Sequence, residues 1–192
     1  AQALFERTES VHKELVIESA YVIMLDHDVE ILKKLIERGV TIRILTNSLA
    51  TNDVLSAHAG YVKQRKHLIE NGIQIYEIRS DASDIDQSII SSKSKASVHT
   101  KCIVFDTQTV ILGSYNLDAR SRNINTEVAL YIDSKELAEH VREFMNEGVD
   151  AKNSYRVSLN KNGNLTWTTQ KNGKEIEYTK EPETTFWQRF ET

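Results

Sequence analysis

The sequence is poor in cysteine, proline and glycine, and it lacks any long apolar run. Among its 192 residues there are one Cys, one Pro and seven Gly. The single cysteine, Cys102, cannot form an internal disulfide, which excludes a small scaffold held together by disulfides. No uninterrupted apolar stretch approaches the roughly 18 residues that a membrane-spanning helix needs. The composition is that of a globular domain large enough to bury a core.

An excess of positive charge is also missing. The chain has 24 Lys and Arg against 28 Asp and Glu, for a net charge of −4. Proteins that bind nucleic acids draw much of their affinity from Lys and Arg on phosphates. The charge balance therefore disfavours nucleic acid as a partner, although a local basic groove would be compatible with it.

The periodicity of apolar residues predicts an α/β fold. Strand-like runs at 15–24, 40–46 and 73–78 alternate with amphipathic helical segments at 26–38 and 53–71. This order is typical of a parallel α/β core. The remaining predicted elements of this unit are a hairpin of two strands, one further strand and a helix, at 98–105, 109–115, 125–132 and 134–148.

Two units are predicted along the chain. Residues 1–152 form the main unit, and residues 153–192 form a small β-meander followed by a tail. Asn-Gly pairs at 162–163 and 172–173 predict the turns of the meander. The segment 80–97 is dense in Ser, Asp and Lys, and we expect a mobile loop there. Because the chain begins without Met and ends in an aromatic stretch, we also expect a piece of a longer protein.

One motif carries the chemistry of the sequence. His99 and Lys101 are followed by Asp106 and then by Gly113, Ser114 and Asn116, in the pattern H-x-K-x4-D-x6-G-S-x-N. Side chains alternate along a strand, so His99 and Lys101 are expected on one side, and Ser114 and Asn116 on one side of the hairpin partner. An imidazole, an ammonium, a hydroxyl and an amide that converge in this way suit a phosphoryl group. A lone His and Lys on a strand would more often be a solvated surface pair, but the complete pattern favours a site.

This motif resembles the HKD signature of the phospholipase D superfamily at every defining position. The resemblance implies a mixed sheet flanked by helices, and chemistry that needs no cofactor and no metal. It implies that His99 is one histidine of a paired site, acting as the nucleophile that forms a phosphohistidine or as the acid that protonates the leaving alcohol. Lys101 and Asn116 would bind the phosphate oxygens with Ser114 beside them, whereas Asp106 would be structural and Gly113 would allow close backbone approach. Glu127 matches the acidic residue that hydrogen-bonds the catalytic histidine in this family.

Further segments resemble the C-terminal half of bacterial cardiolipin synthases, the C-type especially. They are the residues 18–21, 46–53, 58–61 and 116–121, together with a tail that contains Trp167 and the aromatic stretch at 186–190. Ala20 departs from a proline in that pattern. This branch implies a phospholipid substrate, a second HKD half as partner, and peripheral attachment to the bacterial cytoplasmic membrane.

Four residues outside the motif are possible substrate-binding residues. Asn47 and Ser48 end a predicted strand, where ligand sites of α/β proteins lie. His58 lies near the start of a helix and could contact a head group, and Arg120 could hold an anionic phosphate. The alternatives are an ordinary helix-surface position for His58, a solvated pair of Arg120 with Arg122, and positions that do not line the cleft for Asn47 and Ser48.

Three functions remain open at this point. The first is phosphatidyl transfer through a phosphohistidine, with cardiolipin synthesis as the expected reaction. The second is a homodimeric phosphodiesterase or endonuclease that completes its site with a second copy of the chain. The third is a non-catalytic module of the same superfamily, which the intact His99, Lys101, Asn116 and Glu127 disfavour.

Overall fold

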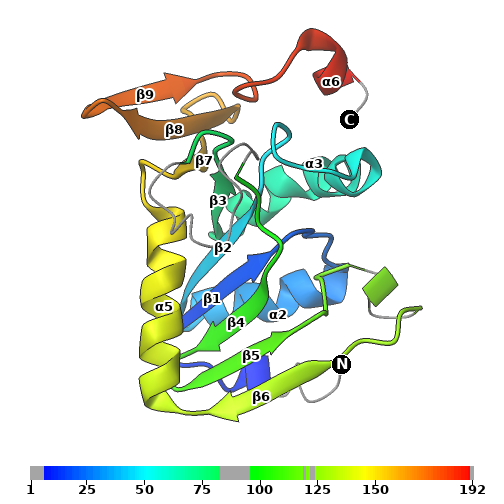
Figure 1. Cartoon of the computed structure of the whole chain (residues 1–192), viewed down its shortest axis with the longest axis vertical. Helices are drawn as coiled ribbons and strands as arrows, with labels where there is room; N and C mark the ends of the chain where they lie inside the picture. Colours follow the sequence, from blue (N-terminus) through cyan, green and yellow to red (C-terminus); the bar gives the residue numbers. More distant parts are fainter. Residues whose placement is uncertain (1–6, 83–95, 119, 122–123, 191–192) are drawn as a thin grey trace.

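The computed structural model describes residues 7–82, 96–118, 120–121 and 124–190. They form one nine-stranded mixed sheet with helices on its faces (Figure 1). The predicted mixed α/β sheet flanked by helices is confirmed. Most of the segment 80–97, which was expected to be a mobile loop, lies outside the described residues. Within the described part of the chain, no helix has both the length and the apolar character needed to cross a membrane.

The sheet has a parallel centre and antiparallel wings. The strand order is β6-β5-β4-β1-β2-β3-β7-β8-β9, in which β1, β2 and β3 are parallel to each other and every other neighbouring pair is antiparallel. The strands are β1 (Glu14–Ser19), β2 (Thr41–Asn47), β3 (Gln74–Ile78), β4 (Lys101–Phe105), β5 (Thr109–Gly113), β6 (Ala129–Asp133), β7 (Ser154–Leu159), β8 (Leu165–Lys171) and β9 (Lys174–Tyr178). The helices are α2 (Asp26–Glu37), α3 (Leu55–Glu70), α5 (Lys135–Val149) and α6 (Phe186–Phe190).

Residues with known capping preferences stand at the ends of three helices. Gly39 follows α2 and Gly72 follows α3, each with φ of +87°, a left-handed conformation that glycine adopts at low cost. Ser134 precedes α5, and its Oγ accepts the backbone N–H of Leu137 at 3.3 Å.

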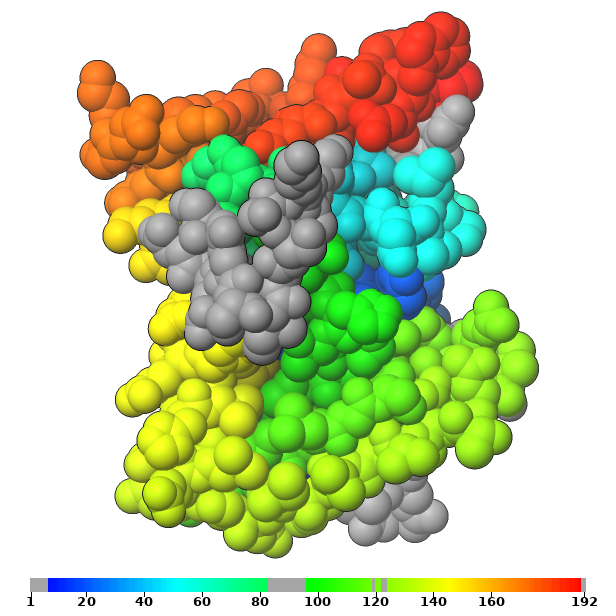
Figure 2. Space-filling model, viewed as in Figure 1, coloured from blue at the N-terminus to red at the C-terminus, as the bar shows by residue number. Residues whose placement is uncertain are grey.

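The two faces of the sheet carry separate cores. On one face α5 packs Ala138 and Met145 against Val16, Cys102 and Val104. Figure 2 shows this helix in yellow beside the green strands of the β4–β6 wing. On the other face α2 and α3 cover a larger cluster to which β1, β2, β3 and β4 all contribute. Burial on both faces explains why the central strands read as nearly continuous apolar runs.

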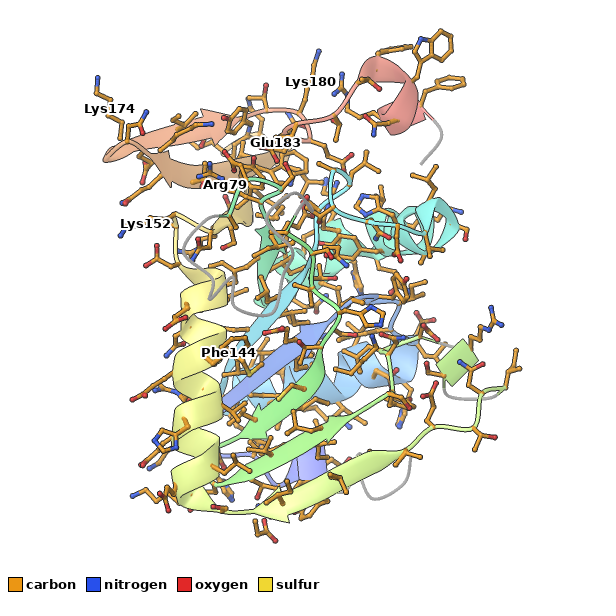
Figure 3. All side chains as sticks on the ribbon, viewed as in Figure 1. Arg79, Phe144, Lys152, Lys174, Lys180 and Glu183 are labelled. Atoms are coloured by element: carbon orange, nitrogen blue, oxygen red, sulfur yellow. The ribbon has the colours of Figure 1, made fainter. Side chains whose placement is uncertain are left out.

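The C-terminal meander continues the main sheet. Strand β7 pairs antiparallel with β3, and β8 and β9 follow through two hairpins. Residues 153–192, expected as a separate small unit, are thus joined to the main unit by strand pairing. Arg79 and Glu183 lie together below the meander in Figure 3. The Glu183 carboxylate accepts the Ser80 N–H at 3.1 Å, and Arg79 donates to the Gln170 carbonyl at 2.8 Å, so polar contacts also hold the tail.

Asp106 forms the turn between β4 and β5. Asp106 and Thr107 have φ of 50° and 54°, as in a two-residue turn of type I′. The Asp106 carboxylate accepts the backbone N–H groups of His12, Lys13 and Glu14 at 2.9, 2.7 and 3.0 Å. Its contacts are therefore to the segment that leads into β1, at the end of β4 opposite to Lys101.

Gly113 ends β5 where the next strand passes very close. A Cβ atom added there would lie 2.2 Å from the Val128 carbonyl oxygen and 2.7 Å from Ala129 Cα. Because both are backbone atoms, Gly113→Ala should force β6 outward and lower the free energy of unfolding by about 1–3 kcal/mol. Gly148→Ala is the control, since its methyl group would meet only the flexible end of the Leu45 side chain. Equal urea midpoints for the two variants would contradict this view of Gly113.

Candidate active site

The motif lies at the edge of the sheet where β1 ends and β4 begins. Lys101 is the first residue of β4 and pairs with Ser19, the last residue of β1. His99 is exposed and lies two residues before the strand, so the predicted strand 98–105 begins later than expected. The Lys101 Nζ atom donates to the His99 carbonyl oxygen at 2.5 Å. The two residues are thus adjacent, but only Lys101 is held by the sheet.

The register of the β4–β5 hairpin does not place Ser114 on the same face of the sheet as Lys101, although the spacing of the motif predicted that the two side chains would converge. Cys102 pairs with Leu112, so the next pair in register would be Lys101 with Gly113. In a continuous ladder Ser114 would then point to the face opposite to Lys101. The β4–β5 ladder ends at the Cys102–Leu112 pair, whereas β5 pairs with β6 as far as Gly113, and the Ser114 N–H then donates to the Val128 carbonyl at 2.9 Å. Strand alternation therefore does not by itself bring Ser114 to the side of Lys101.

Glu127 organises the Gly-Ser-x-Asn segment. Its carboxylate accepts hydrogen bonds from the Ser114 hydroxyl, from Asn125 Nδ2 at 3.1 Å and from the Ser121 hydroxyl. These hydrogen bonds, that of Ser114 foremost, hold the pKa of Glu127 below its usual range. The expected contact of Glu127 with His99 is not among them, because the carboxylate is turned to Ser114 and Ser121.

Asn116 is linked to the same cluster. Its backbone N–H donates to Ser121 Oγ at 3.3 Å, so Ser121 contacts both Asn116 and Glu127. The Asn116 Oδ1 atom is buried, and it has no hydrogen-bond partner within the described part of the chain. Buried acceptors are rarely left unpaired, which marks the Asn116 amide as a group whose partners come from a ligand or from solvent.

Lys101 lies among acidic groups. Burial lowers its pKa, whereas the nearby carboxylates of Asp53 and Glu127 act in the opposite direction. The Tyr21 hydroxyl donates to Asp53 at 2.8 Å, and burial together with this carboxylate raises the pKa of Tyr21 to about 12. Asp53 and Tyr21 were not predicted as site residues. The available signal was their position after β2 and β1, because ligand sites lie beyond the carboxyl ends of parallel strands.

Lys101 lines one pocket, and a second pocket shares residues with it. The first has a volume of about 160 Å³, and its lining includes Lys101, Glu127, Glu18 and Gly113. The second, of about 50 Å³, is mostly apolar and extends toward α2. Both are lined by Ile17, Ile103, Tyr115 and Leu117. The two pockets therefore share part of their walls.

Glu18 is a buried carboxyl group next to the motif that the sequence did not indicate. It is 6% exposed and pairs across β1 and β4 with Cys102. Burial raises the pKa of Glu18, and a hydrogen bond with Thr100, the residue between His99 and Lys101, partly offsets the effect. Burial, with a smaller contribution from Glu18, also raises the pKa of the Cys102 thiol to about 12. Cys102 is thus an inert buried thiol.

The raised pKa of Glu18 predicts a pH-dependent cost to stability. A folded pKa above the unfolded value of 4.5 means that folding favours the protonated form. Folding stability should therefore fall as pH rises from that value through the folded pKa, and level off above it. Glu18→Gln removes this titration, so the urea midpoint of the variant should rise relative to that of the wild type as pH increases from 4.5 through the folded pKa of Glu18. Parallel pH profiles would rule out a perturbed Glu18.

Three of the four possible substrate-binding residues are buried and bonded internally. Asn47, Ser48 and His58 are 2%, 1% and 0% exposed. Asn47 contacts the backbone of Val98, and the Ser48 hydroxyl lies 3.2 Å from Thr51 Oγ1. None of the three lines an open cleft, because the ends of β2 and α3 are covered by other segments. The fourth, Arg120, is exposed, and its Nε donates to Asn125 Oδ1 at 3.4 Å.

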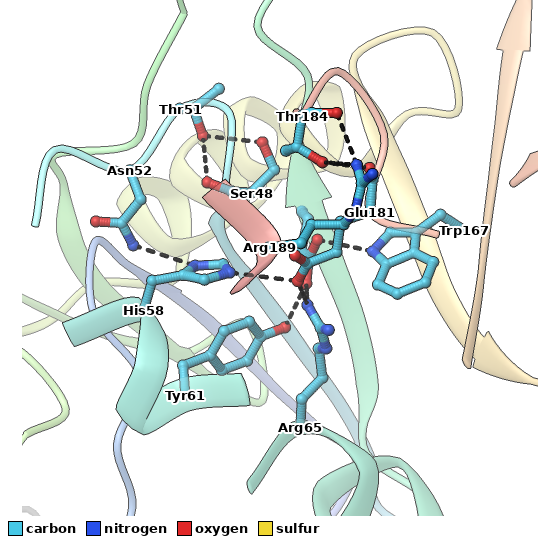
Figure 4. A network of polar contacts seen from close by, with 11 residues as sticks. Ser48, Thr51, Asn52, His58, Tyr61, Arg65, Trp167, Glu181, Thr184 and Arg189 are labelled. Carbon is cyan, nitrogen blue, oxygen red and sulfur yellow. Dashed lines mark hydrogen bonds and ion pairs between the residues drawn. The ribbon is translucent and has the colours of Figure 1, made fainter. Parts of the chain in front are cut away.

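His58 belongs to a buried polar network between α3 and the tail (Figure 4). His58 Nε2 and Arg65 Nη1 contact the Glu181 carboxylate at 3.4 and 2.7 Å. Arg65 also donates to Glu77 at 2.8 Å, and Glu77 accepts from Tyr61 and Trp167 at 2.9 and 2.8 Å. This network anchors the tail and lies apart from the motif. No group of three or more His, Cys, Asp or Glu is placed to hold a metal ion anywhere in the described ranges.

Comparison with known proteins agrees with the fold and the motif. Residues 4–148 match the family model described as "Cardiolipin synthase, PLD-like domain". The chain is 38% identical to cardiolipin synthase C of Escherichia coli K12 over 98% of its own length and 40% of that protein. The chain thus belongs to the family of cardiolipin synthase PLD-like domains, and the resemblance to the phospholipase D superfamily is confirmed. It spans about 40% of the length of this relative.

Solved structures share the fold at low sequence identity. The phospholipase D family member Nuc from Salmonella typhimurium superposes with a TM-score of 0.60 at 19% identity, over 82% of this chain and 91% of that one. Phosphatidylserine synthase from Haemophilus influenzae Rd KW20 gives 0.62 at 16% identity, over 81% of this chain and 36% of that one. These likenesses establish the fold alone.

Proposed function

We propose that this chain is one half of an active site for phosphodiester transfer on phospholipids, with cardiolipin synthesis as the reaction. The observation that carries the proposal is the clustering of motif residues at one edge of the sheet. Lys101 and Glu127 line one pocket, and Ser114 and Asn116 join the same cluster through Glu127 and Ser121. His99 lies at the same edge, next to Lys101. A polar site of this composition suits a phosphoryl group and its two oxygens.

The proposed chemistry proceeds in two displacements. An imidazole nitrogen bonds to phosphorus, the phosphorus–oxygen bond to the leaving alcohol breaks, and a second histidine supplies the proton to that alcohol. The hydroxyl oxygen of an acceptor lipid then bonds to phosphorus, the phosphorus–nitrogen bond breaks to free the first imidazole, and the second histidine takes up the proton of that hydroxyl. Lys101 and the Asn116 amide stabilise the charge on the non-bridging oxygens. His99 takes one of the two histidine roles.

A second half supplies the other histidine in this proposal. The chain contains one H-x-K pair, and the cardiolipin synthase C that it resembles is about two and a half times as long. The partner is thus an N-terminal HKD half of the same protein or a second copy of this domain. An isolated monomer of the 192 residues should show little His99-dependent turnover, because loss of general acid help alone costs about 10²–10⁴ in rate. Size-separated monomer and dimer fractions, assayed with a soluble phosphodiester, test this expectation.

Two features support a lipid as the substrate. The mostly apolar pocket that shares four lining residues with the Lys101 pocket suits a molecule with an apolar portion beside its phosphate. Asp53 and Glu127 near Lys101 make the site unfavourable for a polyanionic strand. Both features, together with the family to which the chain belongs, support a lipid substrate.

An aromatic cluster supports attachment to a membrane surface. Phe186, Trp187 and Phe190 of α6 contact one another and are 66%, 69% and 73% exposed. Aromatic side chains of this kind enter the interface between head groups and acyl chains. We infer that the complete protein is bound peripherally to the bacterial cytoplasmic membrane.

The decisive experiment compares substrates in the full-length protein. With vesicles that contain phosphatidylglycerol, mass spectrometry should detect cardiolipin formation that is lost in His99→Gln. Rapid quenching of the wild type should trap a phosphoprotein that is labile to acid and stable to base, as expected for a phosphorus–nitrogen bond. His99-dependent cleavage of plasmid DNA without lipid transfer would reject the proposal.

That outcome would establish the second candidate, a homodimeric phosphodiesterase or endonuclease. One observation favours it: this chain covers 91% of Nuc, so the fold occurs in a chain hardly longer than the superposed region. A site completed by two copies would make His99-dependent turnover rise with dimer concentration.

A further inference from the structure

The backbone that leads to His99 lies beyond the support of the sheet. Strands β1 and β4 pair from Leu15–Phe105 to Ser19–Lys101, and the ladder ends there. His99 and Val98 therefore have no strand partner on that side. Yet Val98 is buried with Ala96 in a cluster that includes Leu45. Peptide groups in such a position need hydrogen-bond partners of another kind.

The side chain of Asn47 supplies these partners. Asn47 is the last residue of β2 and is 2% exposed. Its Oδ1 accepts the Val98 N–H at 2.8 Å, and its Nδ2 donates to the Val98 carbonyl at 2.9 Å. This two-point contact is the one that a residue in a neighbouring strand would make with Val98. The side-chain amide thus replaces a strand partner one residue before His99.

The remaining hydrogen-bond capacity of Asn47 is also used internally. Nδ2 lies 3.4 Å from the carbonyl oxygen of Ala20, which follows β1, and Oδ1 accepts from Thr51 Oγ1 at 3.3 Å. A side-chain amide has two N–H groups and about two acceptor positions, and all of them are occupied here. Asn47 has no group left for a substrate, so its contribution to the site must pass through Val98.

We propose that Asn47 is a positioning residue for His99. His99 is bracketed by two fixed points: Lys101, the last ladder residue on one side, and Val98, held by Asn47, on the other. Without the Asn47 contact, the path of the two residues before Lys101 would depend on the Lys101 contact with the His99 carbonyl and on the Thr100–Glu18 hydrogen bond. A displacement of about 1 Å at a reacting group can reduce a rate by about 10²-fold. This inference rests on the proposed reaction of His99 with phosphorus.

The test replaces Asn47 with a residue of similar shape and no hydrogen-bonding group. In the full-length protein, Asn47→Leu should lower kcat for a soluble phosphodiester such as bis(p-nitrophenyl) phosphate by about 10–100-fold. KM should change by no more than about twofold, because Asn47 does not contact the substrate. Asn153→Leu is the matched control: Asn153 is also buried and donates to a backbone carbonyl, that of Glu147, at 2.9 Å. The control should lower the unfolding midpoint to a similar degree and leave kcat unchanged.

Two measurements that do not depend on turnover complete the test. Hydrogen exchange of the Val98 amide should be slow in the wild type and fast in Asn47→Leu, because its acceptor is gone. The imidazole resonances of His99 should be sharp in the wild type and broadened or doubled in the variant. If Asn47→Leu does not fold, Asn47→Ser, whose hydroxyl is too short to reach both Val98 groups, takes its place in all three measurements.

Each outcome has one meaning for the proposal. A kcat as high as that of the control variant, or unchanged exchange at Val98, would overturn it. Failure of the wild type to turn over any phosphodiester through His99 would instead refute the proposed function. In that case the His99 resonances alone decide whether Asn47 orders this side chain, and identical spectra for wild type and variant would reject the positioning role as well.

Discussion

Replacing His99 by Gln should reduce phosphodiester turnover by the full-length protein by about 10⁴-fold or more. The amide of glutamine can donate a hydrogen bond, but it can neither attack phosphorus nor carry the proton of a leaving alcohol. The loss should appear in kcat and kcat/KM together, because the missing interaction belongs to the transition state. Lys101 and Asn116 would still bind the phosphate, so KM should change little.

His140→Gln provides the matched control for this prediction. His140 is exposed on α5, which packs on the β-sheet through Ala138 and Met145, and no role in the site is assigned to it. Its substitution should leave turnover and stability unchanged. Initial rates with a soluble phosphodiester and with lipid vesicles measure both variants. Residual activity of His99→Gln above about 1% of the wild type would mean that another group performs the chemistry.

Replacing Arg65 by Met should be the most damaging change to stability, with a loss of about 3–5 kcal/mol. Arg65 is 3% exposed and donates to the carboxylates of both Glu77 and Glu181. It also stacks on Trp167, with 4.8 Å between the guanidinium carbon and the ring centroid. Without the guanidinium, the two buried carboxylates would lose the cation that they share and keep only their contacts with Tyr61, Trp167 and His58. The loss of stability therefore comes mainly from the buried negative charge that is no longer compensated, and less from the loss of the ion pairs themselves.

The neighbouring residue supplies the control. Lys66 forms an exposed pair with Glu70 at 3.9 Å on the same helix, and Lys66→Met should change the free energy of unfolding by less than about 0.5 kcal/mol. Urea denaturation of both variants gives the comparison. Because Glu181 is the tail's contact with this network, limited proteolysis of Arg65→Met should also cut first in the tail. If Arg65→Met lowers the free energy of unfolding by less than about 1 kcal/mol, the buried network does not depend on the guanidinium.

Acid should weaken the same network. Burial alone would raise the pKa of Glu181, but hydrogen bonds and charge from His58 and Arg65 outweigh it and lower the pKa. Stability from this group is present above the unfolded pKa of about 4.5 and is lost as pH falls through the lower folded value. The network thus favours a docked tail at neutral pH.

Local patterns predicted most of the elements. The helices at 26–38 and 53–71 were found within about two residues of α2 and α3, because an apolar stripe of helical period and a following glycine are strong local signals. The strands near the motif were predicted too long. Residues 98–100 and 114–115 adjoin apolar strand residues in the sequence, but the ladder partners that define a strand end at Ser19 and at Ala129. Strand ends depend on neighbours that a local pattern does not contain.

The residues of the candidate site were also predicted only in part. Spacing in the motif was enough to single out His99, Lys101, Ser114 and Asn116 from one sequence. It could not indicate Glu18, Asp53 or Ser121, because single acidic and hydroxyl residues outside a motif are common on any surface. Nor could it show that Glu127 turns to Ser114, since that contact depends on how the loop before β6 closes on the end of β5.

The sequence by itself determined the α/β class and the family, and it predicted the chemistry-bearing groups, because periodicity, glycine positions and a fixed motif are local properties of the chain. Only the tertiary structure decided that the Asn47 side chain hydrogen-bonds the backbone of Val98 and that His58 contacts Glu181 in the tail. It also decided that the meander extends the main sheet. Each of these outcomes joins residues that are between 51 and 123 positions apart or strands that are distant in the chain. Burial and hydrogen bonding select such partners by their position in space, which sequence spacing does not encode.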